Sequence, residues 1–163
     1  MDVLISHILL NIKKSNVNWY EANRKRVEEA FPKMSGNTKE FLASAEQMYE
    51  VFKGNVKIDF APIMVEYCKV FENLLWEYLD RTKEYSVEIQ NNSRKNKCLG
   101  TAGYVIKKGG DGKSLSKYRD IIKRITDLRN GSAHKHVTKE DPDVLWIHDL
   151  IWNGELVTLL CNT

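Results

Sequence analysis

The sequence is poor in cysteine and has no long hydrophobic run, and each absence excludes a class of protein. Its three cysteines, Cys68, Cys98 and Cys161, stand far apart and form no CxxC or Cys/His spacing, so neither a disulfide framework nor a zinc site is expected. No apolar run approaches the roughly 18 residues of a membrane helix, and the first residues lack the basic region of a signal peptide. We therefore expect a cytoplasmic protein with no membrane partner, no metal and no cofactor.

The remaining composition is that of a folded globular chain. Of its 163 residues, 42% are hydrophobic and 29% are charged, which argues against disorder. The net charge of +3 is mild but unevenly distributed, because residues 91–124 hold ten Lys and Arg against only Asp111 and Asp120. Such an excess fits a polyanion such as RNA, although a solvated, lysine-rich face produces the same pattern.

Apolar residues recur at helical spacing along most of the chain. Residues 59–79 carry the widest apolar stripe, with Asp59 placed to cap the helix and Pro62 tolerated in its first turn. Ser114 is placed to cap a later helix, and Gly154 is expected to weaken the last one. We predict an all-α fold of about five to seven helices, with a loop over residues 84–97 and helical signals over residues 3–12, 19–31, 38–52, 59–79, 99–106, 115–128 and 142–160.

The densest polar chemistry follows Leu128, in the run Arg-Asn-Gly-Ser-Ala-His-Lys-His. Arg129 never loses its proton and His134 titrates near neutrality, a pairing suited to chemistry on a phosphodiester. On an uninterrupted helix these two residues project about 140° apart, so a shared site requires a helix break, which we expect at Gly131–Ser132. Asn130 lies four residues before His134 and is placed to orient its imidazole.

The segment Arg129-Asn130-Gly131-Ser132-Ala133-His134 resembles the Rx4-6H motif of HEPN domains, in the form where a polar residue follows the arginine. The run from Ala61 to Asn73 is similar to the long first core helix of one bacterial HEPN group, and Leu99-Gly100-Thr101 is similar to its short LG-containing segment. The resemblance covers residues 58–160. It implies an HEPN-like helical bundle at residues 58–163. Residues 1–57 lie outside the resemblance, and their helical periodicity predicts an N-terminal helical extension packed on that core, so the whole chain is expected to be all-α.

HEPN domains commonly dimerise and bring two Rx4-6H motifs into one cleft. Many are metal-independent endoribonucleases of toxin–antitoxin, abortive-infection and CRISPR-associated antiviral systems. The resemblance therefore implies single-stranded RNA as substrate, a homodimer, and an antitoxin or sensor protein as a further partner. It makes Arg129 and His134 the catalytic pair and Asn130 the polar auxiliary. The ribose 2′-hydroxyl would attack the phosphodiester, giving 2′,3′-cyclic phosphate and 5′-hydroxyl ends.

Other charged residues near the motif have a less specific interpretation. His7 and His148 are expected on helix faces rather than as metal ligands. Four cations are expected to line the approach to the cleft and to bind phosphates, or else to be ordinary exposed charges: Lys123, Arg124, Lys135 and His136.

Two other interpretations remain open from the sequence. The chain is alternatively a non-catalytic helical module for RNA or nucleotide binding or for dimerisation, in which His134 packs at a helix junction and Arg129 pairs with an acid such as Glu72. Without such a pair, Glu72 is expected to be exposed. The third interpretation is that the chain is one domain of a larger effector whose sensor lies elsewhere.

Overall fold

The computed structural model describes residues 19–54, 59–93, 96–134 and 142–162, with residues 133 and 134 described by their backbone only. Within these ranges the regular structure is entirely helical, so the predicted all-α class is confirmed. The expected helix over residues 3–12 lies outside the described residues. The helices are residues 19–30, α2 (Gly36–Phe52), α3 (Ala61–Thr82), α4 (Ser86–Gln90), α5 (Leu99–Lys108), the 3-10 helix η1 (Ser116–Tyr118), α6 (Arg119–His134), α7 (Pro142–Asn153) and α8 (Glu155–Asn162).

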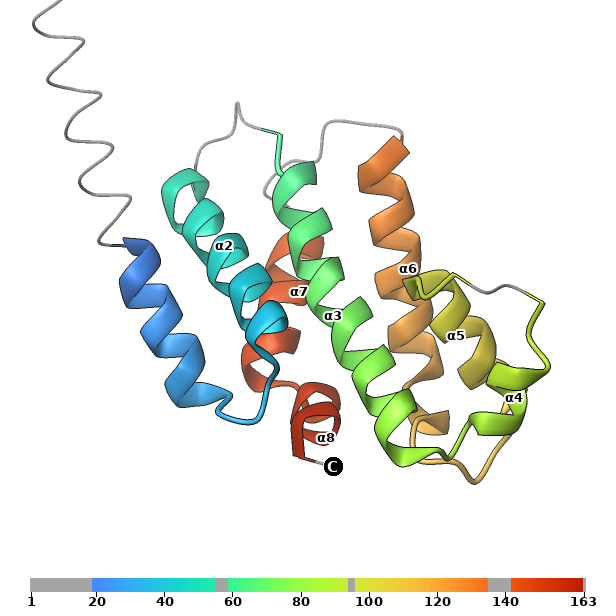
Figure 1. Cartoon of the computed structure of the whole chain (residues 1–163). Helices are drawn as coiled ribbons and strands as arrows, with labels where there is room; N and C mark the ends of the chain where they lie inside the picture. The colour runs from blue at the N-terminus through green and yellow to red at the C-terminus, as the bar shows by residue number, and fades with distance from the viewer. Residues whose placement is uncertain (1–18, 55–58, 94–95, 135–141, 163) are drawn as a thin grey trace, which may run out of the picture.

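Helix α3 is the central element, and α2, α5, α6, α7 and α8 all contact it (Figure 1). Pro62 lies in its first turn, as predicted, but the N-cap residue is Phe60 and not Asp59. Asp59 nevertheless contributes to the helix start, because its Oδ1 accepts a hydrogen bond from Ala61 N at 2.9 Å. The apolar stripe of α3 is buried along its whole length. The buried residues of this stripe are Ile63, Met64, Tyr67, Cys68, Phe71, Leu74, Leu75, Tyr78 and Leu79.

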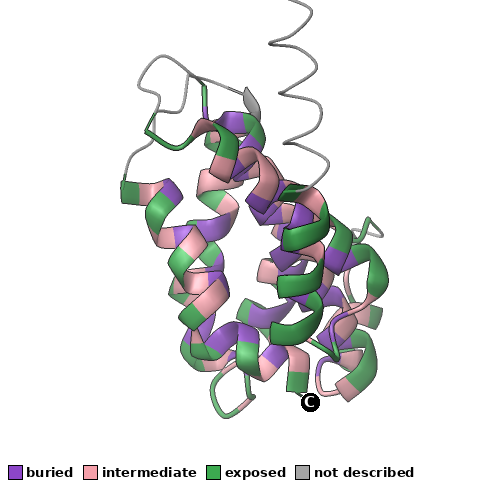
Figure 2. Cartoon of the chain, turned by 90° about the vertical axis from the view of Figure 1, so that its left-hand side faces the viewer, coloured by how far each residue is buried: buried purple, intermediate pink, exposed green. Residues whose placement is uncertain are grey.

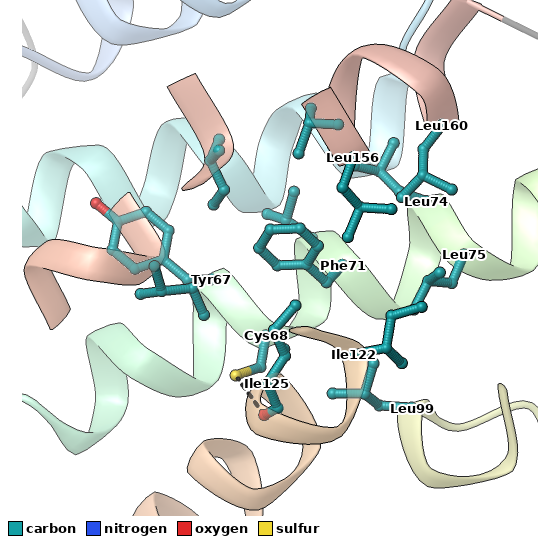
Figure 3. Packing of buried hydrophobic residues seen from close by; sticks show 14 of the residues in the cluster. Tyr67, Cys68, Phe71, Leu74, Leu75, Leu99, Ile122, Ile125, Leu156 and Leu160 are labelled. Carbon is teal, nitrogen blue, oxygen red and sulfur yellow. Dashed lines mark hydrogen bonds between the residues drawn. The ribbon is translucent and has the colours of Figure 1, made fainter. Parts of the chain in front are cut away.

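The described helices share one hydrophobic core. Leu42 of α2, Phe71 of α3, Ile125 of α6 and Leu156 of α8 belong to the same buried cluster, part of which is drawn in Figure 3. Figure 2 shows buried and exposed residues alternating along the longer helices, as expected for amphipathic helices around one core. Residues from both predicted units, 1–57 and 58–163, therefore contribute to that core as far as the chain is described.

Helices α5 and α6 lie side by side against α3 (Figure 1). The backbone N–H of Leu99, at the start of α5, donates to Glu72 Oε2 at 2.7 Å. Glu72 is therefore half-buried and satisfies an otherwise unpaired donor of the α5 N-terminus. The prediction that Glu72 is exposed is therefore wrong. Its hydrogen-bond partner lies 27 residues away in sequence, so helical spacing around Glu72 does not reveal it.

The segment before α6 also differs from expectation. Helix α4 occupies part of the predicted loop over residues 84–97. Ser114 does not cap α6, because η1 intervenes and both the backbone N–H and the hydroxyl of Ser114 contact Glu84 Oε1, at 2.7 and 3.2 Å. Local sequence predicts a cap from Ser114, but here a distant carboxylate binds it.

The predicted last helix is two helices, α7 and α8, which meet at an angle of 44°. A Cβ atom at position 154 would lie only 2.2 Å from the Leu150 carbonyl oxygen, so the bend requires glycine. Gly154 therefore ends α7 rather than merely weakening a continuous helix. Among the described helices, no single one is both long enough and apolar enough to span a membrane. Helices α7 and α8 meet both criteria only when the bent pair is counted as one segment.

Candidate functional site

The motif begins on the last turns of α6, and the expected helix break is absent. Helix α6 continues through Gly131 and Ser132 to His134. Gly131 has no positive φ angle, and nothing lies within 4 Å of a Cβ built there. A helical glycine costs only about 1 kcal/mol relative to alanine, and the buried Ile122 and Ile125 hold this helix against the core.

Because α6 is uninterrupted, the directions of the motif side chains follow from helical geometry. Positions 129 and 134 are five residues apart and so project about 140° apart, whereas positions 130 and 134 lie on one face. The side chain of His134, together with Lys135 and His136, lies outside the described residues. Within one chain, α6 therefore does not direct positions 129 and 134 to a common point.

Arg129 lies near the C-terminal end of α6 and is half-buried. Its guanidinium donates to Asn130 Oδ1 at 3.4 Å, and it forms no ion pair within the described part of the chain. Burial raises the pKa of the Cys68 thiol to about 12, while the nearby Arg129 opposes this shift and Glu72 adds to it. Arg129 and Glu72 thus lie near the same thiol, but the ion pair expected in the non-catalytic alternative is not formed, because Glu72 binds Leu99 N.

The two described RNA-binding candidates lie on the exposed surface of α6 and are already paired. Lys123 Nζ lies 2.5 Å from Asp127, and this carboxylate raises the pKa of Lys123. Arg124 lies 2.5 Å from Asp143 and stacks 4.0 Å above the Trp146 ring. Exposed ion pairs contribute little to stability, so a phosphate oxygen can replace either carboxylate at small cost.

Most of the basic excess in residues 91–124 is likewise neutralised in three dimensions. The paired residues are Lys97 with Asp80, Lys113 with Glu88, Lys117 with Glu155 and Arg119 with Asp111. Within the described ranges, Lys107 and Lys108 of α5 form no ion pair, and Lys108 lies 5.7 Å from the Tyr104 ring. Within the described part of residues 91–124, the positive charge that remains unpaired therefore lies on α5.

The opposite side of the end of α6 faces the start of α3. A hollow of about 450 Å³ lies there, lined by Ser132 of α6, by Asp59 before α3, and by Val65 and Glu66 of α3. Glu66 is paired with Lys69 Nζ at 2.7 Å, and Asp59 Oδ1 accepts a hydrogen bond from Ala61 N at 2.9 Å. The surface between α5 and α6 also carries two carboxylates, Asp120 and Asp127, so carboxylates alone do not favour either side for a polyanion.

A buried polar cluster was missed by the sequence analysis. Glu46 of α2 is fully buried and accepts a hydrogen bond from the Tyr67 hydroxyl at 2.8 Å. His148 Nε2 and Arg26 Nη1 each lie 3.4 Å from Glu46 Oε2, and the Arg26 guanidinium lies 3.8 Å above the Trp152 ring. The cluster joins four helices, but its carboxylate is inaccessible to a substrate.

Burial alone raises the pKa of Glu46, but the contacts from His148 and Tyr67 outweigh it and leave the net pKa below its usual value. A sequence signal was present, because Glu46 lies four residues after Leu42 and three before Tyr49, on the apolar stripe of α2. His148 is 25% exposed and its ring stacks on Tyr49 at 4.8 Å. It therefore packs within this cluster and contacts the Glu46 carboxylate.

Within the described ranges, no three His, Cys, Asp or Glu side chains gather in a group able to hold a metal ion. Comparisons of the chain with models of protein families, with curated proteins and with solved structures find no match. The HEPN resemblance therefore rests on the motif residues and stays a prediction.

Proposed function

We propose that the chain is an HEPN-like, metal-independent endoribonuclease that cleaves single-stranded RNA. The observation that carries this proposal is Arg129, a half-buried cation with no ion pair in the described part of the chain. The neighbouring Arg124 on the same helix does have a carboxylate partner. A pre-positioned guanidinium without such a partner is suited to bind a phosphate.

The chemistry follows from the three motif residues. His134 would remove the proton from the ribose 2′-hydroxyl or deliver one to the leaving 5′-oxygen, since its ordinary pKa lies near neutrality. Arg129 would stabilise the negative charge that develops on the phosphorus oxygens, and Asn130 would orient the imidazole from the preceding turn. The products would carry 2′,3′-cyclic phosphate and 5′-hydroxyl ends.

The register of α6 supports a homodimer as the active form. Because positions 129 and 134 diverge on one helix, Arg129 of one chain would act with His134 of the other at a two-fold axis. Lys123, Arg124, Lys135 and His136 would bind the flanking phosphates. Such an enzyme suits a cytoplasmic toxin or antiviral effector, restrained by an antitoxin or a sensor protein.

The same divergence favours a second candidate, a non-catalytic helical module for RNA or nucleotide binding or for dimerisation. In that case Arg129 would bind phosphate without any proton transfer by His134. The two candidates differ in whether bound RNA is cleaved.

The test uses labelled single-stranded RNA with and without EDTA. We expect cleavage by the wild-type chain in EDTA, and a loss of at least about a hundredfold in Arg129→Ala and His134→Ala. Arg129→Ala should change the free energy of unfolding by less than about 0.5 kcal/mol, since no ion pair is lost. Lys25→Ala, which alters an exposed lysine far from the motif, is the matched control.

A modified substrate tests the attack by the 2′-hydroxyl, and mixed dimers test whether two chains share one site. A 2′-deoxyribose at the cleaved position should block the reaction. Mixed dimers of Arg129→Ala and His134→Ala chains should recover part of the activity if each site takes one residue from each chain. Wild-type protein that binds RNA but leaves it intact under all these conditions would favour the non-catalytic module.

A further inference from the structure

A groove of about 420 Å³ lies between α5 and α6. Gly100, Gly103 and the buried Ile122 line its inner part, while the exposed Tyr104 and Lys107 lie on its α5 rim. Lys123, Thr126 and Asp127 form its α6 rim. Its volume falls in the range of about 300–1,000 Å³ that is usual for small-ligand sites.

The two glycines are not required by the packing of α5 on α6. A Cβ atom at position 100 would lie 3.9 Å from Thr126 Cγ2, and one at position 103 would lie 3.6 Å from Ile122 Cγ2. Both are ordinary van der Waals distances, and neither glycine has a positive φ angle. Glycine in a helix is nevertheless less favourable than alanine. The two glycines therefore lower the helix propensity of α5. Because they carry no side chains, they leave the groove open.

We propose that this groove holds one nucleotide of the RNA substrate. The Tyr104 ring, 42% exposed on the rim, offers a face on which a base can stack. Lys107 can bind a phosphate, and Lys123 can do so by exchanging its exposed ion pair with Asp127. Thr126 and the Asp127 carboxylate can then accept hydrogen bonds from ribose hydroxyls or base amino groups. The lining also includes Asp120. Cations together with two carboxylates around an apolar floor match a nucleotide, which offers hydrogen-bond donors as well as a phosphate, better than they match inorganic phosphate.

The position of the groove connects it to the motif. Thr126 lies one helical turn before Asn130, about 6 Å along α6, and on the same face. A strand with its scissile phosphate at Arg129 and Asn130 would place a neighbouring nucleotide in the groove. This proposal rests on the proposed function for the identity of the strand, whereas binding in the groove does not require cleavage.

Groove-filling variants test the proposal in full-length Arg129→Ala protein, which is not expected to cleave the probe. The measurement is the Kd for a fluorescently labelled single-stranded oligoribonucleotide by anisotropy. Gly103→Ala should raise Tm by about 3 °C while weakening binding, and Gly103→Leu should weaken binding about tenfold, the size expected for one stacked base. Gly36→Ala is the matched control, since it also adds a helical methyl group in open space, at the start of α2, and should leave Kd unchanged.

Rim variants keep the test valid if Gly103→Leu fails to fold. Tyr104→Ala should weaken binding about tenfold, and Lys107→Gln should reduce the slope of log K against log salt by about 0.7, as expected for one lost phosphate contact on a single strand. Equal Kd values for the parent protein, Gly103→Ala, Tyr104→Ala and Lys107→Gln would overturn the proposal.

Competition with free nucleoside 5′-monophosphates shows whether the groove binds a nucleotide of an RNA strand or a free nucleotide. Weak competition by AMP, GMP, CMP and UMP relative to the oligoribonucleotide is the expected result. Competition by a free nucleotide at the affinity of the oligoribonucleotide would overturn the substrate assignment. If the groove variants weaken RNA binding but the wild-type chain never cleaves RNA, the proposed nuclease activity is refuted and the groove proposal is not. If the wild-type chain cleaves RNA and filling the groove leaves cleavage unaffected, the groove proposal is refuted and the nuclease activity is not.

Discussion

Replacing Tyr67 by phenylalanine tests the buried polar cluster. The change removes the hydrogen bond that the Tyr67 hydroxyl donates to Glu46 Oε1 at 2.8 Å and leaves the ring in place. Both side chains are fully buried, so bulk solvent does not replace the lost donor. A hydrogen bond to a charged group contributes about 1.5–3 kcal/mol. We expect Tyr67→Phe to lower the free energy of unfolding by this amount and Tm by about 3–12 °C.

The loss should depend on pH because the acceptor is a carboxylate. Burial raises the pKa of Glu46, but contacts from His148 and Tyr67 favour the charged form, and the net pKa is lowered. A lowered folded-state pKa adds stability above the unfolded value of about 4.3, and this stability is lost as the pH falls through the folded value. The difference between wild type and Tyr67→Phe should therefore be largest near neutral pH and shrink below about pH 4.

Urea unfolding followed by far-UV circular dichroism, near neutral pH and in acid, measures this difference. Tyr118→Phe is the matched control, because its hydroxyl bonds at 3.4 Å to the exposed Glu155 and its loss should cost little. A double-mutant cycle with Glu46→Gln isolates the pairwise energy. Identical midpoints for wild type and Tyr67→Phe, or a difference that does not change with pH, would refute the reasoning.

Three further predictions concern single contacts. Glu72→Ala should cost about 1 kcal/mol in urea unfolding, because the Leu99 N–H at the start of α5 loses its acceptor; unchanged stability would contradict this. Gly154→Ala should lower stability by about 1–3 kcal/mol, since its Cβ would lie 2.2 Å from the Leu150 carbonyl oxygen, and a Tm equal to that of wild type would show that α7 and α8 can straighten. The Cys68 thiol, its pKa raised by burial to about 12, should resist thiol reagents in native protein at mildly alkaline pH and react in urea; rapid native labelling would show that the core opens.

Helical periodicity predicts most of this fold, because an amphipathic stripe reports directly which face of a helix is buried. It places both ends of α2 and the start of α3 to within two residues, and the end of α3 to within three. It does not predict α4, and it merges α7 with α8, because the break depends on the Leu150 carbonyl oxygen above Gly154. The expected break at Gly131–Ser132 fails for the opposite reason: packing of α6 on the core outweighs the weak helix propensity of glycine.

The sequence by itself determines the helical class, the central position of the α3 stripe, and the motif residues Arg129 and Asn130 with their spacing to His134. Only the tertiary structure decides which charges are neutralised. Arg124 of α6 forms an ion pair with Asp143 of α7, Arg129 forms none in the described part of the chain, and Glu46 becomes the buried centre of a four-helix cluster. The reason is that an electrostatic interaction depends on distance in space and on burial, and separation along the chain reports neither.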